Sequence, residues 1–327
     1  MEKLLNDIKK SARIKQCIYP DKTKCNGKIK KSHAIQNNRI LNKLAVNGEV
    51  RTMNATSNIF FQDTKNEGRG IATTFFGFCD YHDTILFRDI EDVSFKKTQK
   101  QVFLFTYRTF AWHYHKKMEQ LSYVDLLRDT FNMYNDELIE YNQMVELGNQ
   151  DNKKRKATLD DAITNEKYDI LNYSIWEIPY EVQFAVSAMI ELDYDLEGNE
   201  INPLKQYKND DILKSLYINI FPDENKSFCI LSWFKENNEY EVFANQFMHL
   251  KFKDKVNYMN NMLPIRTDKI IISPKMWNLW DNKVKESFIS FANMDFLIMS
   301  MFNEEGYKYE YKYTPYNLFQ CSSKFKR

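Results

Sequence analysis

Thr74-Phe75-Phe76-Gly77-Phe78-Cys79-Asp80-Tyr81-His82-Asp83 is the stretch that decides the fold of this 327-residue chain. Its first half completes an apolar run, Ile71–Phe78, whose composition predicts a β-strand. Apolar residues then recur at helical spacing from Ile85 to Ile90, which predicts a helix beginning near His82. Cys79 and His82 therefore form a Cys-x-x-His pair at the junction between a strand and a helix.

A second pair of candidate metal ligands, Cys17 and Cys25, precedes this junction and flanks a turn-rich segment. Three thiolates and one imidazole complete a tetrahedral zinc site, and zinc prefers sulfur and nitrogen to the oxygen ligands of magnesium or calcium. The sequence therefore predicts a structural Zn²⁺ held by Cys17, Cys25, Cys79 and His82. The eight-residue step between the first two is wider than the usual spacer. The alternative is that the cysteines are unrelated thiols.

The charge balance excludes a polybasic nucleic-acid binder, because 46 Lys and Arg residues stand against 45 Asp and Glu residues. Any basic surface must therefore be local. Hydrophobic residues make up 43% of the chain, yet no apolar run approaches the roughly 18 residues of a membrane span. The charged N-terminus lacks a signal-peptide pattern, and five cysteines, an odd number, favour a reducing compartment. We expect a soluble cytoplasmic protein without membrane association.

The pattern along the chain predicts an α+β protein with three parts. A zinc-binding domain covers residues 1–98, with a strand at 29–35, a helix near 39–47 and a polar loop at 51–69. A helical hairpin region covers residues 99–172, because apolar residues form wide stripes there. A mixed α/β domain of unknown role covers residues 173–327. Its β-branched and aromatic runs predict strands at 173–178, 182–192, 215–221, 228–234 and 270–272, with helices over 239–262 and 274–291.

Two blocks carry a resemblance to a known family: Lys31-Ser32-His33-Ala34-Ile35-Gln36 and the quoted stretch at 74–83, followed by Leu86-Phe87. Residues 15–92 resemble the zinc-bearing branch of the HNH nucleases, whose ββα-metal fold grows from a treble-clef zinc finger. They also resemble an N-terminal finger of uncharacterised bacterial proteins near phage-defence genes. The chain departs from the HNH pattern by using His82 where a cysteine is usual and Asp83 where a histidine is usual.

The resemblance implies a metal-dependent endonuclease acting on DNA or RNA, as an effector of bacterial antiviral defence. His33 falls where the family activates the attacking water, Asp83 where it binds a catalytic Mg²⁺ or Mn²⁺, and Thr74 where a supporting Asn is common. These residue types suit the chemistry, because an imidazole is a base near neutral pH and a carboxylate binds hard cations. Lys28, Lys30 and Lys31 lie beside His33 and are placed to contact a nucleic-acid backbone.

Other hypotheses remain open at this point. The main alternative is a non-catalytic zinc-stabilised module that binds nucleic acid or a protein partner. In it, His33 is a buried structural histidine, or a zinc ligand in place of His82. A third hypothesis is a homo-oligomeric scaffold built on the helical hairpin.

The predicted helical hairpin also carries two basic features without an assigned role. His113 and His115 lie on different faces of a helix, which argues against a shared metal. They form either a solvated helix face or a basic aromatic face for nucleic acid, together with Lys100, Arg108, Lys116 and Lys117. The run at 153–156 predicts an exposed turn or, alternatively, a phosphate contact.

Overall fold

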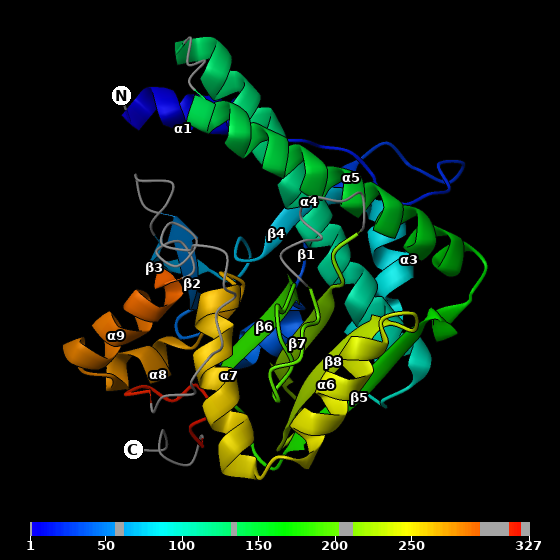
Figure 1. Ribbon diagram of the computed structural model, residues 1–327. Coiled ribbons are helices and arrows are strands. Elements are labelled where there is room, and N and C mark those ends of the chain that lie inside the picture. The colour runs from blue at the N-terminus through cyan, green and yellow to red at the C-terminus, as the bar shows by residue number, and fades with distance from the viewer. Residues whose placement is uncertain (1, 56–61, 132–135, 203–211, 295–313, 322–327) are drawn as a thin grey trace.

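The fold combines one large antiparallel sheet with helices on both of its faces, in keeping with the mixture of helices and strands expected for an α+β protein (Figure 1). This computed structural model describes residues 2–55, 62–131, 136–202, 212–294 and 314–321.

The sheet has seven strands in the order β3-β2-β9-β6-β7-β8-β5, and neighbouring strands are antiparallel. Every residue of β6, β7 and β8 is buried. Strands with such continuous apolar runs need cover on both faces, and the helices supply it. The strands are β2 (Glu49–Ala55), β3 (Gln62–Gly68), β5 (Leu171–Ile178), β6 (Phe184–Ile190), β7 (Leu216–Pro222), β8 (Ser227–Phe234) and β9 (Ile270–Ile272).

Helices α6 (Asn238–His249) and α7 (Phe252–Arg266) cover one face of this sheet. Aromatic side chains fill the space between them and the strands, as where the ring centroids of Trp176 and Phe247 lie 5.9 Å apart. Two short helices, α8 (Pro274–Leu279) and α9 (Asn282–Ala292), pack beside β2 and β3. The C-terminal half therefore has its own apolar layer on this side of the sheet.

Helix α4 (Gln99–Phe131) crosses the other face, and α5 (Asp136–Thr164) runs back beside it (Figure 1). All residues from 101 to 112 are buried, because α4 lies between the sheet and the N-terminal elements β4 (Thr74–Cys79) and α3 (Asp80–Glu91). A helix covered all round needs apolar residues on every face, as this one has. None of the described helices is both long and apolar enough to cross a membrane.

The interpretation of α4 as a solvated or nucleic-acid-binding face is wrong for two of its residues. The side chains of Arg108 and His115 are 2% and 0% exposed. His115 Nε2 donates to the carbonyl of Ile14 at 2.9 Å, so this histidine anchors the segment after α1 (Glu2–Ser11) to α4. The two basic side chains are buried because α4 packs on three sides, which the helical periodicity alone does not reveal.

Polar side chains line the surface of α4 that faces the sheet. The hydroxyl of Thr106 lies 2.7 Å from that of Ser232, and the hydroxyl of Thr109 lies 2.8 Å from that of Ser187. These pairs satisfy polar groups inside an otherwise apolar interface. His113 continues the same surface one turn later, and burial lowers the pKa of its imidazole to about 3.

Replacement of His113 by glutamine is expected to flatten the pH dependence of stability in acid. The unfolded chain takes up a proton at the ordinary histidine pKa of 6.5, whereas the folded chain resists it until about pH 3. The stability of the wild type therefore falls as the pH drops through this window, by up to about 1.4 kcal/mol per pH unit. Urea unfolding at neutral pH and at about pH 5 measures this, and parallel losses in both proteins would contradict it.

The N-terminal region places a two-stranded sheet and a helix beside α4. Strand β1 (Ile29–His33) pairs antiparallel with β4, from Ile29 opposite Cys79 to His33 opposite Thr74. Helix α3 follows β4 directly. The strand-to-helix junction predicted at Cys79 is therefore present.

The helix predicted near 39–47 is shorter than expected. It consists of a π-helical turn, η1 (Asn37–Leu41), and one α-helical turn, α2 (Asn42–Leu44). The side-chain oxygen of Gln36 accepts from the N–H groups of Arg39 and Ile40 and so caps its start. The pair Asn47-Gly48, with φ angles of 51° and 78°, then turns the chain into β2, because both residues tolerate this left-handed backbone.

Within the segment at 51–69, predicted as a polar loop, residues 51–55 and 62–68 instead lie in the paired strands β2 and β3. Strand β3 lies at the edge of the sheet and exposes polar side chains, so the apolar alternation of a strand is weak there. Strand β2 pairs with β9, with Arg51 opposite Ile272. The sheet thus crosses the domain boundaries expected at residues 98 and 172, and one buried core includes residues from Cys17 to Ile271.

Candidate metal centre

Four side chains from two parts of the N-terminal region meet at one point: Cys17, Cys25, Cys79 and His82. Their ligand atoms all lie within 4.8 Å of one another. His82 Nδ1 lies 3.5 Å from Cys17 Sγ, 3.5 Å from Cys25 Sγ and 3.2 Å from Cys79 Sγ. In a tetrahedral site with zinc bonds of ~2.3 Å to sulfur and ~2.0 Å to nitrogen, the nitrogen–sulfur edges measure about 3.5 Å. The predicted ligands are therefore close enough to hold a metal ion and compatible with structural zinc.

The acidities of the thiols show why a cation fits this cluster. One ring nitrogen makes one hydrogen bond, so hydrogen bonding does not account for three sulfur atoms around Nδ1. Burial and the sulfurs of Cys17 and Cys79 raise the pKa of Cys25 to about 12. Burial opposes ionisation of Cys79 too, but N–H groups of His82 and Asn26 hold its pKa below the ordinary value. A bound Zn²⁺ would stabilise the negative charges of the three thiolates and so keep the cysteines deprotonated.

The eight-residue spacing between Cys17 and Cys25 is accommodated by a folded turn. The carboxylate of Asp21 accepts from the N–H of Thr23 at 2.8 Å and from its hydroxyl at 2.6 Å. The N–H of Cys25 then donates to the carbonyl of Lys22 at 3.1 Å. The eight-residue spacing therefore brings both sulfurs to one side of the loop.

The other two ligands are fixed by regular structure. Cys79 is the last residue of β4, and His82 lies in the first turn of α3. The N–H of Ile18 donates to the carbonyl of Gly77 at 2.8 Å, which holds the Cys17 segment alongside β4. Both ligand pairs are thus tied to the same strand.

Tyr19 completes the surroundings of the histidine ligand and was not identified from the sequence. Its ring stacks on the His82 imidazole with centroids 4.3 Å apart. Burial lowers the pKa of His82, which keeps the ring in the neutral form that binds metals. The only sequence signal for Tyr19 is its position two residues after Cys17.

His33 ends β1, at the opposite end of the two-stranded sheet from Cys79. The hypothesis that it replaces His82 as a ligand is wrong, because the group of side chains close enough to hold a metal ion contains His82 and not His33. Its Nδ1 lies 3.2 Å from the carbonyl oxygen of Ala72, and a carbonyl only accepts, so Nδ1 carries the proton and Nε2 is left to accept one. Burial, followed by the charge of Arg108, lowers the pKa of His33.

Asp83 lies in the first turn of α3, with only 10% of its side chain exposed. Its charge favours the protonated form of His33, but burial has the larger effect and lowers the pKa of that histidine. Lys30 Nζ lies 3.5 Å from the Asp83 carboxylate and pairs with it. Among the described residues, one group of three or more side chains could hold a metal ion, and it is the Cys₃His cluster. Asp83 is not part of that group.

Thr74 lies directly opposite His33 in the β1–β4 pair. Its hydroxyl donates to the carbonyl of Ile71 at 2.7 Å and so holds the turn that leads into β4. Thr74 is therefore the cross-strand neighbour of His33, and its supporting role stays a prediction.

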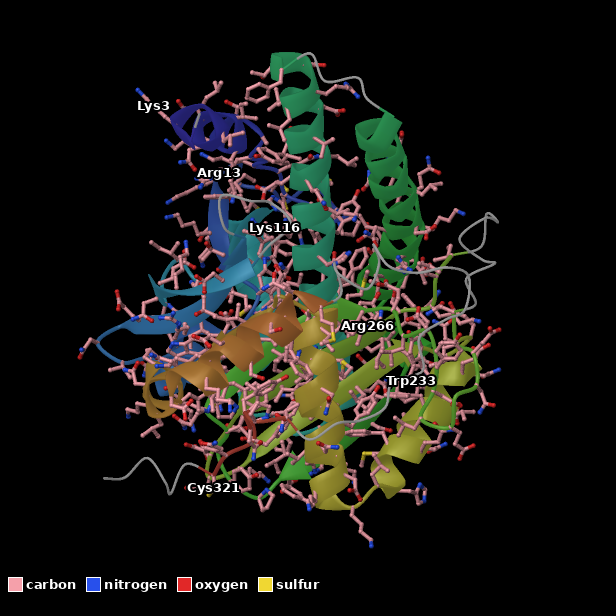
Figure 2. The ribbon with its side chains drawn as sticks, turned by 60° about the vertical axis from the view of Figure 1, so that its left-hand side comes forward. Lys3, Arg13, Lys116, Trp233, Arg266 and Cys321 are labelled. Atoms are coloured by element: carbon pink, nitrogen blue, oxygen red, sulfur yellow. The ribbon has the colours of Figure 1, made fainter. Side chains whose placement is uncertain are left out.

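The three lysines predicted to contact nucleic acid are exposed on β1 or just before it. Lys30 is occupied by its carboxylate partners, whereas Lys28 and Lys31 extend the basic surface on either side. This surface belongs to a strongly basic segment, since residues 1–31 hold ten Lys and Arg residues against three Asp and Glu residues. Figure 2 shows Lys3 and Arg13 of this segment at the α1 end of the molecule.

Arg108 enters the surroundings of His33 from α4 and was not assigned to them by sequence reasoning. It donates to Glu91 at 2.7 Å, and its guanidinium carbon lies 4.1 Å from the centroid of the Phe87 ring. Its Nε and Nη1 are buried without a hydrogen-bond partner among the described residues. Only the packing of α4 against α3 brings this charge close to His33, so no local pattern could reveal it.

No protein-family model, curated protein or solved structure matches the chain.

Proposed function

We propose that this protein is a zinc-stabilised endonuclease that cleaves DNA or RNA with a divalent cation. One observation carries the proposal: His33 has its Nδ1 proton turned to the carbonyl of Ala72, which leaves Nε2 able to accept a proton. The order of elements supports it. One ligand pair precedes β1 and the other lies at the β4–α3 junction, which resembles the treble-clef, ββα arrangement of the HNH nucleases.

The residues would divide the work in the following way. Cys17, Cys25, Cys79 and His82 hold the structural ion and fix β4 against α3. His33 Nε2 accepts the proton of a water molecule as its oxygen bonds to phosphorus and the bond to the leaving sugar oxygen breaks. Asp83 would hold Mg²⁺ or Mn²⁺, which would stabilise the charge that develops on the phosphate. Lys28 and Lys31 would position the backbone of the nucleic acid.

Replacement of His33 by alanine is expected to lower cleavage about 10²–10⁴-fold while zinc content is unchanged, because a general base contributes on this order. Cleavage of supercoiled plasmid and of single-stranded RNA, with Mg²⁺ or Mn²⁺, measures the activity. Elemental analysis of the purified protein measures zinc.

The matched control is His249→Ala, which removes an exposed histidine from α6 and is expected to cleave like the wild type. If the wild type cleaves neither substrate with either ion, or His33→Ala cleaves as fast as the wild type, the nuclease proposal fails.

A second candidate is a non-catalytic zinc module that binds nucleic acid or protein, and the Lys30–Asp83 ion pair favours it. A carboxylate already neutralised by lysine is a poorer ligand for a catalytic ion. This candidate is supported if labelled DNA or RNA binds without being cut, and if Lys28→Gln with Lys31→Gln weakens the binding. A role in bacterial antiviral defence follows from the resemblance alone and stays a prediction.

A further inference from the structure

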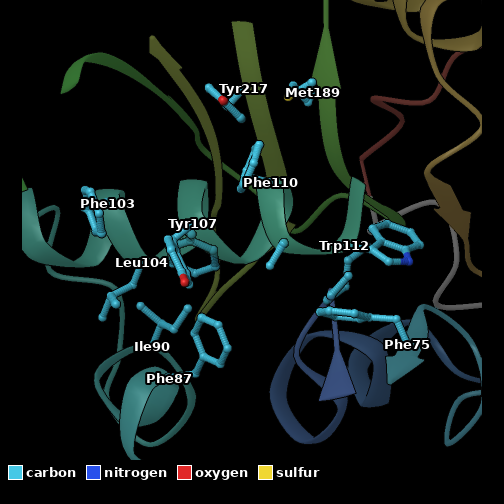
Figure 3. Packing of buried hydrophobic residues seen from close by; sticks show 14 of the residues in the cluster. Phe75, Phe87, Ile90, Phe103, Leu104, Tyr107, Phe110, Trp112, Met189 and Tyr217 are labelled. Carbon is cyan, nitrogen blue, oxygen red and sulfur yellow. The ribbon is translucent and has the colours of Figure 1, made fainter. Parts of the chain in front are cut away.

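The two paired strands β1 and β4 present one face to the core and the other to the surface. Ser32 and Phe75 are opposite each other and are both buried. Figure 3 shows Phe75 in the buried cluster, and its ring centroid lies 5.5 Å from that of His115 on α4. Side chains alternate between the faces of a strand, so the next pair, His33 and Thr74, lies on the outer face, where both are partly exposed.

A bulge brings an aromatic side chain onto this outer face. The pairing shifts by one residue in the middle of β1, so Phe76 and Gly77 of β4 both lie opposite Lys31. An extra residue of this kind re-aims the side chains around it. Phe76 is partly exposed, although Phe75 and Phe78 are buried. The bulge therefore places an accessible ring next to Lys31, on the face that carries the predicted general base.

Positive charge lies on both sides of the Phe76 ring. Lys15 Nζ lies 5.3 Å from the ring centroid. The N–H of Gln16 donates to the carbonyl of Phe76 at 3.1 Å, which holds the Lys15 segment along one edge of β4, while Lys31 lies on β1 at the other edge. Both lysines are exposed, and neither forms an ion pair with a described carboxylate. This face therefore combines one aromatic ring with two cations that are available to an anionic ligand.

We infer that this face binds a single-stranded segment of nucleic acid, with one base stacked on Phe76 and the adjacent phosphates against Lys15 and Lys31. The bases of a single strand offer their flat faces to an aromatic side chain, whereas the bases of a duplex are already stacked on one another. A cation over an exposed ring is held weakly, so Lys15 can yield its place to a base and contact a phosphate instead.

The position of the ring suits cleavage beside the stacked base. Thr74 lies directly opposite His33, and Phe76 is two residues further along β4. Diagonal neighbours on paired strands lie about 7–8 Å apart, so the phosphodiester bond next to the stacked nucleotide would be within reach of His33. The inference rests on the proposed function for this role of His33, and it adds the substrate class, a single strand of DNA or RNA. The binding itself does not require cleavage.

The test measures binding without cleavage. The full zinc-loaded chain is titrated, without Mg²⁺ or Mn²⁺, into a fluorescein-labelled DNA strand, the RNA strand of the same sequence, or the DNA duplex, and fluorescence anisotropy is recorded at constant ionic strength. The wild type is expected to bind at least one of the single strands about tenfold more tightly than the duplex, on the scale of one stacked base. The DNA and RNA strands show which sugar the face prefers.

Two substitutions of Phe76 separate stacking from charge. Phe76→Leu keeps an apolar side chain and removes the flat ring, so affinity for the single strand should fall about tenfold while affinity for the duplex hardly changes. Phe76→Trp should bind the single strand at least as tightly as the wild type. Lys15→Gln and Lys31→Gln, at exposed positions that do not affect folding, should each weaken single-strand binding and reduce its salt dependence.

Two matched controls lie away from this face. Phe252→Leu changes an exposed phenylalanine of α7, and Lys154→Gln removes an exposed charge from α5; both should bind like the wild type. The run at 153–156 that contains Lys154, predicted as an exposed turn, is instead part of α5. His33→Ala removes the predicted base and leaves the ring and both cations, so it should bind single strands normally.

The outcomes distinguish this inference from the nuclease proposal. Equal affinity of the wild type for single strands and duplex would overturn the inference, and so would single-strand binding by Phe76→Leu, or by both lysine variants, that matches the wild type. Those results would leave the nuclease proposal intact if His33→Ala still loses cleavage. A wild type that prefers single strands through Phe76 and cleaves none of them would retain the inference and refute the nuclease proposal.

Discussion

Replacement of Cys79 by serine is expected to release the metal ion and to destabilise the whole chain. Cys79 supplies one of the three sulfurs of the cluster and is fully buried, so the variant leaves two thiols and an imidazole, one donor fewer than a tetrahedral zinc site needs. Because structural zinc sites contribute on the order of 10 kcal/mol in isolated fingers, we expect a loss of more than about 3 kcal/mol here. Elemental analysis after gel filtration and urea unfolding measure the two effects.

The control for Cys79→Ser is Cys321→Ser, which changes a cysteine outside the cluster and should retain the zinc content and stability of the wild type. Treatment of the wild type with a chelator should lower its thermal midpoint toward that of Cys79→Ser and leave the variant unchanged. A Cys79→Ser protein with full zinc content and unchanged stability would show that the cluster does not hold a structural ion.

Replacement of Phe78 by alanine is expected to cost about 3–5 kcal/mol of unfolding free energy, the range for a large buried aromatic residue. Phe78 is fully buried next to Cys79, and its ring contacts Phe87 of α3 and Tyr107 of α4 with centroids 5.3 Å and 6.4 Å away. It therefore joins the metal-binding elements to the helix that covers the sheet. Urea unfolding should show a lower midpoint with an unchanged slope.

Phe76, two residues earlier in β4, gives a matched control. It is partly exposed and has Lys15 Nζ 5.3 Å from its ring centroid. Phe76→Ala should therefore cost clearly less than Phe78→Ala. If the two variants are equally stable, the ring of Phe78 does not join the two parts. If Phe78→Ala unfolds in two separate transitions, the finger and the sheet do not share one cooperative core.

The metal ligands could be predicted from the sequence because they depend on residue type and clustering. Three of the five cysteines and a Cys-x-x-His pair lie in the first ninety residues, and the structure brings them together. The central strands were also predictable, since β6, β7 and β8 are continuous apolar runs whose burial follows from composition. Both signals are local, so neither requires knowledge of the tertiary contacts.

What the sequence did not reveal depends on contacts between distant segments. The β2–β3 hairpin has polar residues and gains its place by pairing with β9. Arg108 reaches the surroundings of His33, and Arg155 becomes buried, only because α4 and α5 pack against other elements. A charged residue in an apolar helix is predicted to be exposed when its tertiary neighbours are unknown.

The pairing of β2 with β9 has a consequence for how the chain folds. Arg51 and Ile272 are neighbours in the sheet although more than two hundred residues separate them along the chain. While the protein is being synthesised, β2 therefore lacks its inner neighbour until more than two hundred further residues have left the ribosome. An unpaired strand edge in a long-lived intermediate promotes aggregation, and non-local pairing slows folding. We expect the order of synthesis to make β9 the element whose arrival completes the sheet.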